Sequence, residues 1–295
     1  LSRGDGTVCA SAEMPNIDVC EKGLYEICKV SVSMPEVRGS EKLTLEAKLF
    51  ADGEVYSKNS WEIWVYEKGE TLSYNDFINY DDGKNVVTAD MAKAFSSLEQ
   101  GKNVCLVYRS EWTRHVANKA QQNPAYAFKA TWNRYKPVIW DRGTNYGGLC
   151  NAGLLKKFGF ASDKFYGLNY SLLSEDCDKI ILDDFPVKVE TVVSGIDKSC
   201  RDRFDAYKGS FNLPEIMPDR TLRDFGYLFS LKVGSGKLLV CGFNLTGLDR
   251  NEPSSAGMAK FILNYIKSQD FAPENGISLG ELKGYMKKCA LSPVK

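Results

Sequence analysis

The residues best suited to covalent chemistry are the cysteines and the single histidine. The sequence has nine cysteines and one histidine, His115, so a thiol nucleophile would have one candidate base. Cys150 follows Gly147, Gly148 and Leu149, a run similar to the tight turn that presents a hydrolase nucleophile. A catalytic thiol needs a base that orients and deprotonates it, and no histidine follows Cys150 in the chain. A Cys-dependent hydrolase is therefore the least favoured function, and we interpret His115 as a surface or interface residue.

Carboxylate clusters are the second candidate for chemistry. Cleavage of a glycosidic bond needs two carboxylates about 5 to 10 Å apart across the sugar. Each acidic cluster of this chain lies beside Gly, Pro or Ser, where turns favour Asp for backbone reasons, so we interpret them as solvated turn carboxylates. No eight-fold βα pattern is present that would carry a catalytic pair on a barrel. The clusters are Asp81-Asp82, Glu175-Asp176-Cys177-Asp178 and Asp183-Asp184.

An aromatic segment between residues 112 and 146 is the strongest candidate for binding. Planar aromatic rings suit the apolar faces of sugars and arginines suit their hydroxyls, but the same composition suits a domain interface. Both interpretations stay open, and packing is favoured over sugar binding. The candidate carbohydrate-binding or interface residues are Trp112, Tyr126, Trp132, Tyr135, Trp140, Tyr146, Arg134 and Arg142.

Charge and composition exclude several partner classes. Lys plus Arg equals Asp plus Glu at 38 each, whereas a duplex-binding surface or a polybasic membrane patch leaves a basic excess, so we expect no nucleic-acid partner. No run of about 18 apolar residues predicts a membrane span. The lack of Cys-x-x-Cys and the single histidine argue against zinc, and we expect no metal and no cofactor. The Gly-rich stretch 232–237 joins two predicted strands, so it is not a phosphate-binding loop.

The termini and cysteines leave the compartment open. The chain begins Leu1-Ser2-Arg3 without a signal-type apolar core, which indicates a trimmed precursor or an expressed fragment. Cys20 and Cys28 could pair across two strands, whereas Cys105 and Cys241 lie in apolar strands and are expected to be free and buried. A periplasmic or secreted location is slightly favoured over the cytoplasm.

Residues 1–68 are predicted to be all-β. The run 24–32 alternates apolar and polar residues imperfectly, whereas 42–50 alternates well and 61–66 alternates again. Gly, Pro and Asp-Gly punctuate these runs. In the run 42–50, Leu43, Leu45, Ala47 and Leu49 fall on one face. Short strands at this spacing favour an immunoglobulin-like β-sandwich, one that the low strand count suggests is incomplete.

Residues 69–270 are predicted to form an α/β domain. A strand at 86–87, a helix capped by Asp90 and closed by Gly101, and a strand at 103–108 make a βαβ unit, which favours a parallel sheet. Further strands are expected at 178–182 and 187–193. Strands at 227–233 and 237–243 should form a hairpin, followed by a helix that Ser254 or Ser255 opens. Residues 271–295 are expected to be a helical tail.

Four stretches carry a resemblance to a known family. Trp132-Asn133-Arg134-Tyr135-Lys136-Pro137-Val138-Ile139-Trp140, then Gly147 to Cys150, and above all the hairpin from Gly226 to Leu245, resemble the C-terminal region of bacterial family 2 glycoside hydrolases, the β-galactosidase and β-glucuronidase group. The stretch Asn59 to Tyr66 resembles the last strand of that family's immunoglobulin-like module. The His-Pro of the family is absent at Asn151-Ala152. The resemblance implies an Ig-like β-sandwich followed by a flavodoxin/class I amidotransferase-like α/β domain.

The resemblance implies a role without catalysis in this chain, because none of the family's catalytic motif is present. The expected function is a non-catalytic accessory portion of a glycoside hydrolase that supports the catalytic barrel, oligomerisation or the substrate cleft. The rival is a stand-alone carbohydrate-binding protein that uses the segment 112–146. An exposed apolar patch would favour the first function and a concave aromatic groove the second. The expected partners are carbohydrate, the catalytic domain of a parent enzyme, or a second copy of the chain.

Overall fold

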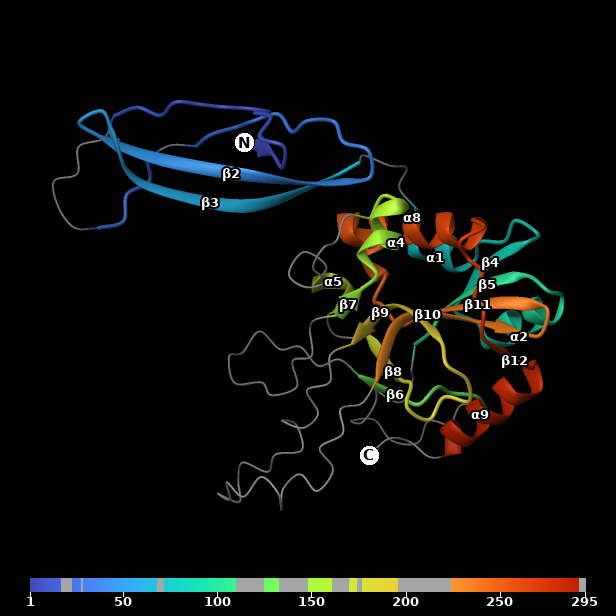
Figure 1. The fold of residues 1–295 in the computed structure, drawn as a ribbon. Helices are drawn as coiled ribbons and strands as arrows, with labels where there is room; N and C mark the ends of the chain where they lie inside the picture. The colour runs from blue at the N-terminus through green and yellow to red at the C-terminus, as the bar shows by residue number, and fades with distance from the viewer. Residues whose placement is uncertain are drawn as a thin grey trace, which may run out of the picture. The chain divides into compact units, whose positions relative to one another are not determined.

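The chain has mixed α/β content and divides into two compact units, Leu1–Lys68 and Gly69–Lys295 (Figure 1). The computed structural model describes residues 1–16, 23–27, 29–67, 72–109, 125–132, 148–160, 170–173, 177–195 and 224–291. Within these ranges, every helix is too short or too polar to cross a membrane. We call Leu1–Lys68 the N-terminal unit and Gly69–Lys295 the C-terminal unit.

The N-terminal unit contains an antiparallel sheet of β1 (Ser2–Arg3), β2 (Ser40–Ala51) and β3 (Glu54–Tyr66), in the order β1-β2-β3. Asp52 and Gly53 join the two long strands with positive φ angles of 51° and 82°, as a tight hairpin turn requires. The predicted strands 42–50 and 61–66 are confirmed. The strand predicted at 24–32 is wrong for the described residues of that run, which have no strand neighbour and leave Leu24, Ile27 and Val30 exposed. The immunoglobulin-like arrangement stays a prediction.

The β2–β3 hairpin has one apolar and one charged face. Leu43, Leu45, Ala47 and Leu49 lie opposite Ile63, Trp61, Asn59 and Ser57, which confirms the predicted shared face. On the other face Lys42 pairs with Glu62, and Glu46 pairs with both Lys48 and Lys58. Hydrogen bonds from these two lysines lower the pKa of Glu46 to about 2. The charged side chains of this face therefore already pair with one another.

The C-terminal unit contains the predicted βαβ unit. Strand β4 (Asn85–Thr88) and strand β5 (Asn103–Val107) pair in parallel, and α2 (Met91–Glu99) connects them. Asp90 caps the helix by accepting hydrogen bonds from the amides of Ala92 and Lys93. Gly101 follows the helix with a φ angle of 77°, so both predicted helix ends are confirmed.

The remaining strands complete a mixed sheet around the predicted hairpin. Strands β10 (Phe225–Val233) and β11 (Gly236–Cys241) pair antiparallel, while β11 also pairs in parallel with β5. The path of the sheet is β4-β5-β11-β10-β8-β6, and β9 and β12 also pair with β10. Strand β9 begins at Glu190 instead of the predicted Val187. The other bounds are β6 (Ala130–Trp132), β7 (Gly148–Cys150), β8 (Asp178–Ile181), β9 (Glu190–Gly195) and β12 (Gly276–Ile277).

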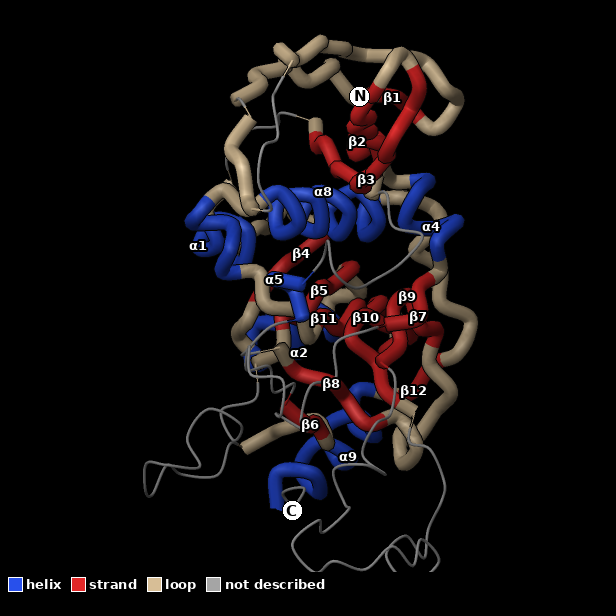
Figure 2. The backbone as a smooth tube through the Cα atoms, turned by 90° about the vertical axis from the view of Figure 1, so that its left-hand side faces the viewer, coloured by secondary structure: helices blue, strands red, loops and turns tan. Residues whose placement is uncertain are grey.

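Helices cover both faces of this sheet, as Figure 2 shows. Helix α8 (Pro253–Lys267) packs its predicted stripe, including Met258 and Ile262, into one apolar cluster. Helices α2 and α9 (Leu279–Leu291) pack into a second cluster on the other face. Other helical segments in the described ranges are α1 (Tyr74–Ile78), α4 (Ala152–Lys157), α5 (Tyr170–Leu173) and the 3₁₀ segment η2 (Thr246–Arg250).

Two expectations for the chain's last third need correction or extension. Helix α8 does not open at Ser254 or Ser255, because Pro253 occupies its first position, where a missing N–H costs nothing, and Glu252 precedes it. The tail from residue 271 contains the predicted helix, α9. It also contributes strand β12 to the sheet, where Gly276 pairs with Lys232 of β10.

Gly242 makes a very tight backbone approach. Its amide donates to the carbonyl of Tyr227 and its carbonyl accepts from the amide of Asp178, both at 2.8 Å. A Cβ atom at this position would lie 2.1 Å from the Asp178 carbonyl oxygen. We expect Gly242→Ala to lower the free energy of unfolding by about 1–3 kcal/mol, the usual cost of overpacking, measured by urea unfolding followed by near-UV circular dichroism.

Gly284→Ala in α9 is the matched control. A Cβ atom there meets nothing within 4 Å, so the substitution should raise the free energy of unfolding by about 0.5–1 kcal/mol through helix propensity. Equal effects of the two substitutions would contradict the close approach at Gly242.

Candidate functional site

A cavity of about 580 Å³ lies beside α9 in the C-terminal unit. Three separate segments form its walls: the residues before β6, the turn after β8, and one side of α9. The amide of Ala127 donates to the carbonyl of Met286 at 3.1 Å, and the amide of Ile181 donates to that of Lys129 at 2.7 Å, so backbone hydrogen bonds fix the first wall against the other two. The lining residues are Lys129, Asp184, Pro186, Glu281, Gly284, Tyr285, Lys288 and Cys289.

The cavity combines charged groups with one aromatic ring. Lys129 and Asp184 form an ion pair across its wall, and the ring of Tyr285 packs 4.9 Å from that of Phe185. Burial raises the pKa of the Tyr285 hydroxyl, and the Cys289 thiol beside it adds to that rise. Such a lining can hydrogen-bond a polar, uncharged molecule with several hydroxyls, because it offers carboxylate acceptors and ammonium donors together.

Contacts with neighbouring groups restrict the chemistry that Glu281 and Cys289 can perform in this cavity. The Glu281 carboxylate accepts hydrogen bonds from the amide and the hydroxyl of Ser278, at 2.8 and 2.7 Å, and the Ser278 hydroxyl accepts from the Glu281 amide. This is the capping box that begins α9, so Glu281 has a structural role. Burial raises the pKa of the Cys289 thiol although Tyr285 and Lys129 act to lower it, which keeps the thiol protonated near neutral pH.

The predicted aromatic segment reaches this region through its described residues. Tyr126 packs edge-on against Phe95 at 5.0 Å, and the Lys287 ammonium lies 5.6 Å from its ring centroid. Tyr126 therefore lies between α2 and α9 and not in the cavity lining. Trp132 ends β6. The other candidates, Trp112, Arg134, Tyr135, Trp140, Arg142 and Tyr146, lie outside the described residues.

The carboxyl ends of the parallel strands form a second polar cluster. Ligands of open α/β sheets usually bind at this edge, so its residues merit comparison with the cavity. Arg109, which follows β5, donates to Asn244 Oδ1 at 2.9 Å, and Thr246 donates to the same oxygen through its amide and hydroxyl. Burial raises the pKa of the nearby Cys241 thiol to about 12, against the lowering effect of the Arg109 charge. The Cys241 thiol therefore stays protonated at neutral pH.

Cys150 occupies a strand–turn–helix context. It ends β7, and the next residue, Asn151, caps α4 by accepting from the amide of Leu154 at 3.1 Å. The thiol is half-buried, not disulfide-bonded, and packs against the apolar cluster beneath α8. His115 and Cys20 and Cys28 lie outside the described residues. In the described ranges, no group of three His, Cys, Asp or Glu side chains could hold a metal ion.

Two profiles of domains of unknown function match the chain. Residues 1–67 match DUF8488, and residues 218–287 match DUF8487. No curated protein matches the sequence. The first match covers nearly the whole N-terminal unit, and the second runs from before β10 into α9, which includes part of one wall of the cavity.

Only partial signals for the cavity exist in the sequence. Asp184 belongs to a cluster that the sequence marks as a turn, and the spacing of Ser278 and Glu281 marks the start of a helix. Nothing in the sequence brings Lys129, Asp184 and Tyr285 together, because 55 residues separate Lys129 from Asp184 and the strand pairing that joins them is not local.

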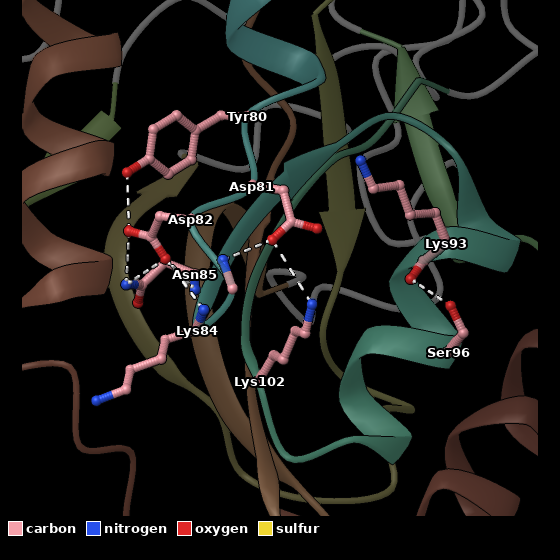
Figure 3. Close-up of polar contacts among 9 residues, drawn as sticks. Tyr80, Asp81, Asp82, Lys84, Asn85, Lys93, Ser96 and Lys102 are labelled. Carbon is pink, nitrogen blue, oxygen red and sulfur yellow. Dashed lines mark hydrogen bonds and ion pairs between the residues drawn. The ribbon is translucent and has the colours of Figure 1, made fainter.

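The acidic pair Asp81-Asp82 lies at the opposite, amino-terminal edge of β4 and β5 (Figure 3). Asp82 Oδ1 accepts from the amides of Lys84 and Asn85, at 3.1 and 2.7 Å, and Asp82 Oδ2 accepts from the Tyr80 hydroxyl at 2.8 Å. Asn103 then donates both to Asn85 and to the carbonyl of Ile266 in α8. The predicted turn role is therefore correct for this pair, and the turn is tied to two strands and a helix.

Asp82 should make stability depend on pH. Burial alone would raise the pKa of its carboxyl, but hydrogen bonds from Asn85, Tyr80 and Lys84 outweigh it and hold the pKa below its ordinary value of 3.8. The stabilisation is therefore complete above pH 3.8 and is lost as the pH falls toward the folded-state pKa, because the unfolded chain binds the proton more tightly. We expect Asp82→Asn to cost about 1–2 kcal/mol in urea unfolding at pH 7, and the cost to shrink by pH 3.

Glu99→Gln, the same carboxylate-to-amide change on the exposed end of α2, serves as the control. This substitution should leave the free energy of unfolding almost unchanged or raise it slightly, since a carboxylate near a helix C-terminus is slightly unfavourable. A cost for Asp82→Asn that does not change between pH 7 and pH 3 would contradict the charged network.

Proposed function

We propose that this chain is a non-catalytic accessory portion of a carbohydrate-degrading glycoside hydrolase. The observation that carries the proposal is that the N-terminal unit exposes large apolar side chains instead of burying them in a core. Among the described residues of positions 1–67, Leu43 is the one buried hydrophobic residue. All exposed large hydrophobic side chains in the described ranges, apart from Leu291, belong to this unit. A unit that buries so little apolar surface depends on a partner surface for its stability.

The apolar face of the hairpin is the surface that such a partner would cover. Leu45, Leu49 and Trp61 share this face of β2–β3 and are 36%, 46% and 47% exposed. Contiguous apolar patches with charged residues around them mark protein contact sites on soluble proteins. The charged side chains of the opposite face already pair with one another, so the apolar face is the side that suits a catalytic domain.

Two further observations support an accessory role. The stretch Gly226 to Leu245, which carries the strongest family resemblance, contains the β10–β11 hairpin. The described carboxylates of the candidate clusters also have structural partners: Asp82 holds a turn, Asp183 accepts from the amide of Asp224, and Asp184 pairs with Lys129. These partners favour scaffold roles over the acid and base of a glycosidase.

Trp61→Lys tests the apolar face. The test partner is the catalytic portion of a bacterial family 2 glycoside hydrolase. The hydrolase's own C-terminal modules, which carry the pattern of Gly226 to Leu245, are first removed. The full chain should then form a complex with this catalytic portion. Because a buried Trp is a typical hot spot, Trp61→Lys should weaken that complex about thirtyfold or more in sedimentation velocity. Thr44→Lys, on the charged face beside Glu62, is the matched control and should leave the complex unchanged. Absence of any complex with the wild-type chain would contradict the accessory role.

The cavity beside α9 favours a second candidate function, carbohydrate binding by the chain itself. Its size of about 580 Å³ and its mixture of Tyr285 with carboxylates and ammonium groups suit a small saccharide.

Titration calorimetry against a panel of plant and host oligosaccharides tests this alternative. If the cavity is a sugar site, the chain should bind at least one oligosaccharide with a Kd of about 1 mM or lower, and Asp184→Asn should abolish the heat. Asp183→Asn changes the neighbouring carboxylate, which does not line the cavity, and should bind normally. Trp112→Ala tests the aromatic segment in the same way. If no oligosaccharide of the panel binds, carbohydrate binding by the chain is contradicted and the accessory role is the function that remains.

A further inference from the structure

Strand β3 exposes one backbone edge along its length. Within the described residues, β3 pairs with β2 and with no other strand, and its side chains from Glu54 to Glu62 are exposed. An edge strand of 13 residues without proline is an effective template for pairing with another strand. The sheet therefore offers a second kind of contact, distinct from the apolar face of the hairpin.

The direction of each backbone amide in β3 follows from one hydrogen bond and from the register with β2. The amide of Glu67, just beyond the strand, donates to the carbonyl of Gly39 on the β2 side. Backbone direction alternates in an antiparallel strand, and the register runs without a break from Tyr66 to Ser57, so even-numbered residues in this stretch point away from β2. The amide of Ser60 donates to the Asn59 side chain, at Oδ1 and 2.9 Å, so pairing with another strand would replace this local hydrogen bond. Lys58, Ser60 and Glu62 are thus the residues whose backbone can bond to another strand.

We propose that β3 pairs antiparallel with β3 of a second copy of this chain, about a two-fold axis at Ser60. An axis through a strand makes an isologous contact in which each residue pair occurs twice. With the axis at Ser60, Lys58 lies opposite Glu62 of the second copy, and Glu62 lies opposite its Lys58. The contact then joins two three-stranded sheets into one.

Charge selects this register over its neighbours. An axis at Lys58 or at Glu62 would place that residue opposite its own copy, and like charges directly opposite one another destabilise strand pairing. An axis at Asn59 or Trp61 would leave both charged residues opposite uncharged ones. The axis at Ser60 alone among these five sets unlike charges across the contact.

The register also extends ion pairs that each copy already contains. Lys42 Nζ lies 3.2 Å from Glu62 Oε1, and Lys58 pairs with Glu46. Across the joined sheet the sequence of charges would be Lys42, Glu62, Lys58 of the second copy and Glu46 of the second copy. Alternating signs over four strands stabilise a network more than an isolated surface pair does. The contact uses the strand edge, so it is independent of the apolar face and of the identity of any parent enzyme.

Charge reversal in two separate variants tests the contact in the full chain. Sedimentation equilibrium at low salt should show a wild-type dimer. Lys58→Glu and Glu62→Lys each create two like-charge pairs across the axis, so each variant should raise the dimer Kd about tenfold or more.

An equimolar mixture of the two variants should dimerise again. One chain of the mixed pair carries carboxylates at both positions and the other carries ammonium groups at both, so unlike charges again lie opposite one another across the axis. Restoration by mixing separates the contact from any loss of folding, since both variants carry the same internal changes before and after mixing.

Lys48→Glu is the matched control. Lys48 pairs with Glu46 as Lys58 does, but it lies on β2 and away from the exposed edge, so its reversal should leave the dimer Kd unchanged. A wild-type chain that stays monomeric, a dimer that Lys58→Glu does not weaken, or a mixture that fails to dimerise would each overturn the proposal. None of these results bears on Trp61 or on the hydrolase complex.

Discussion

Burial of the central strands on both faces is the constraint on which the C-terminal unit depends. Along β5 and β11 alternate residues enter opposite apolar clusters: Val104 and Val240 pack toward α2 and α9, while Cys105 and Leu239 pack toward α8. Such strands need an apolar residue at every position, and they need helices on both sides to exclude water. Their free cysteines act as small hydrophobic residues, because burial raises the pKa of the Cys105 thiol and keeps it uncharged.

This two-sided core restricts polar chemistry to the rim of the sheet. The amino-terminal edge holds the Asp82 network, the carboxyl edge holds Arg109 and Asn244, and the cavity lies where α9 and the turn at Asp184 meet. The first two sites satisfy much of their hydrogen bonding internally. The cavity differs because its lining leaves open volume beside mixed charges, and ligand sites in proteins typically combine such volume with a few polar groups. Sugar recognition by the chain would therefore be located there, apart from the apolar hairpin face.

Local sequence patterns predicted the parts of the fold that local physics determines. The caps at Asp90 and Gly101, the β10–β11 hairpin and the buried stripe of α8 depend on residues within one element. The run 24–32 alternates imperfectly and forms no strand in its described residues, because a strand also needs a neighbour with which to pair. The start of α8 was misplaced because serine favours a cap, but Pro253 fixes the first turn one residue earlier. The cavity could not be predicted, since pairing between distant segments creates it.

The N-terminal unit differs from the core of the C-terminal unit because it exposes large apolar side chains. Its long hairpin separates apolar from charged side chains as a half-buried sheet does, yet the apolar side of Leu45 and Trp61 remains exposed. A sheet gains stability only when its apolar face is covered, and an edge such as β3 is either blocked or paired. The face is apolar and unspecific in register, whereas the edge carries unlike charges, Lys58 and Glu62, that specify one register. Coverage by a different domain suits the face, because burial of apolar area requires only a complementary shape. Pairing with an identical strand suits the edge, because a two-fold axis satisfies both charges at once.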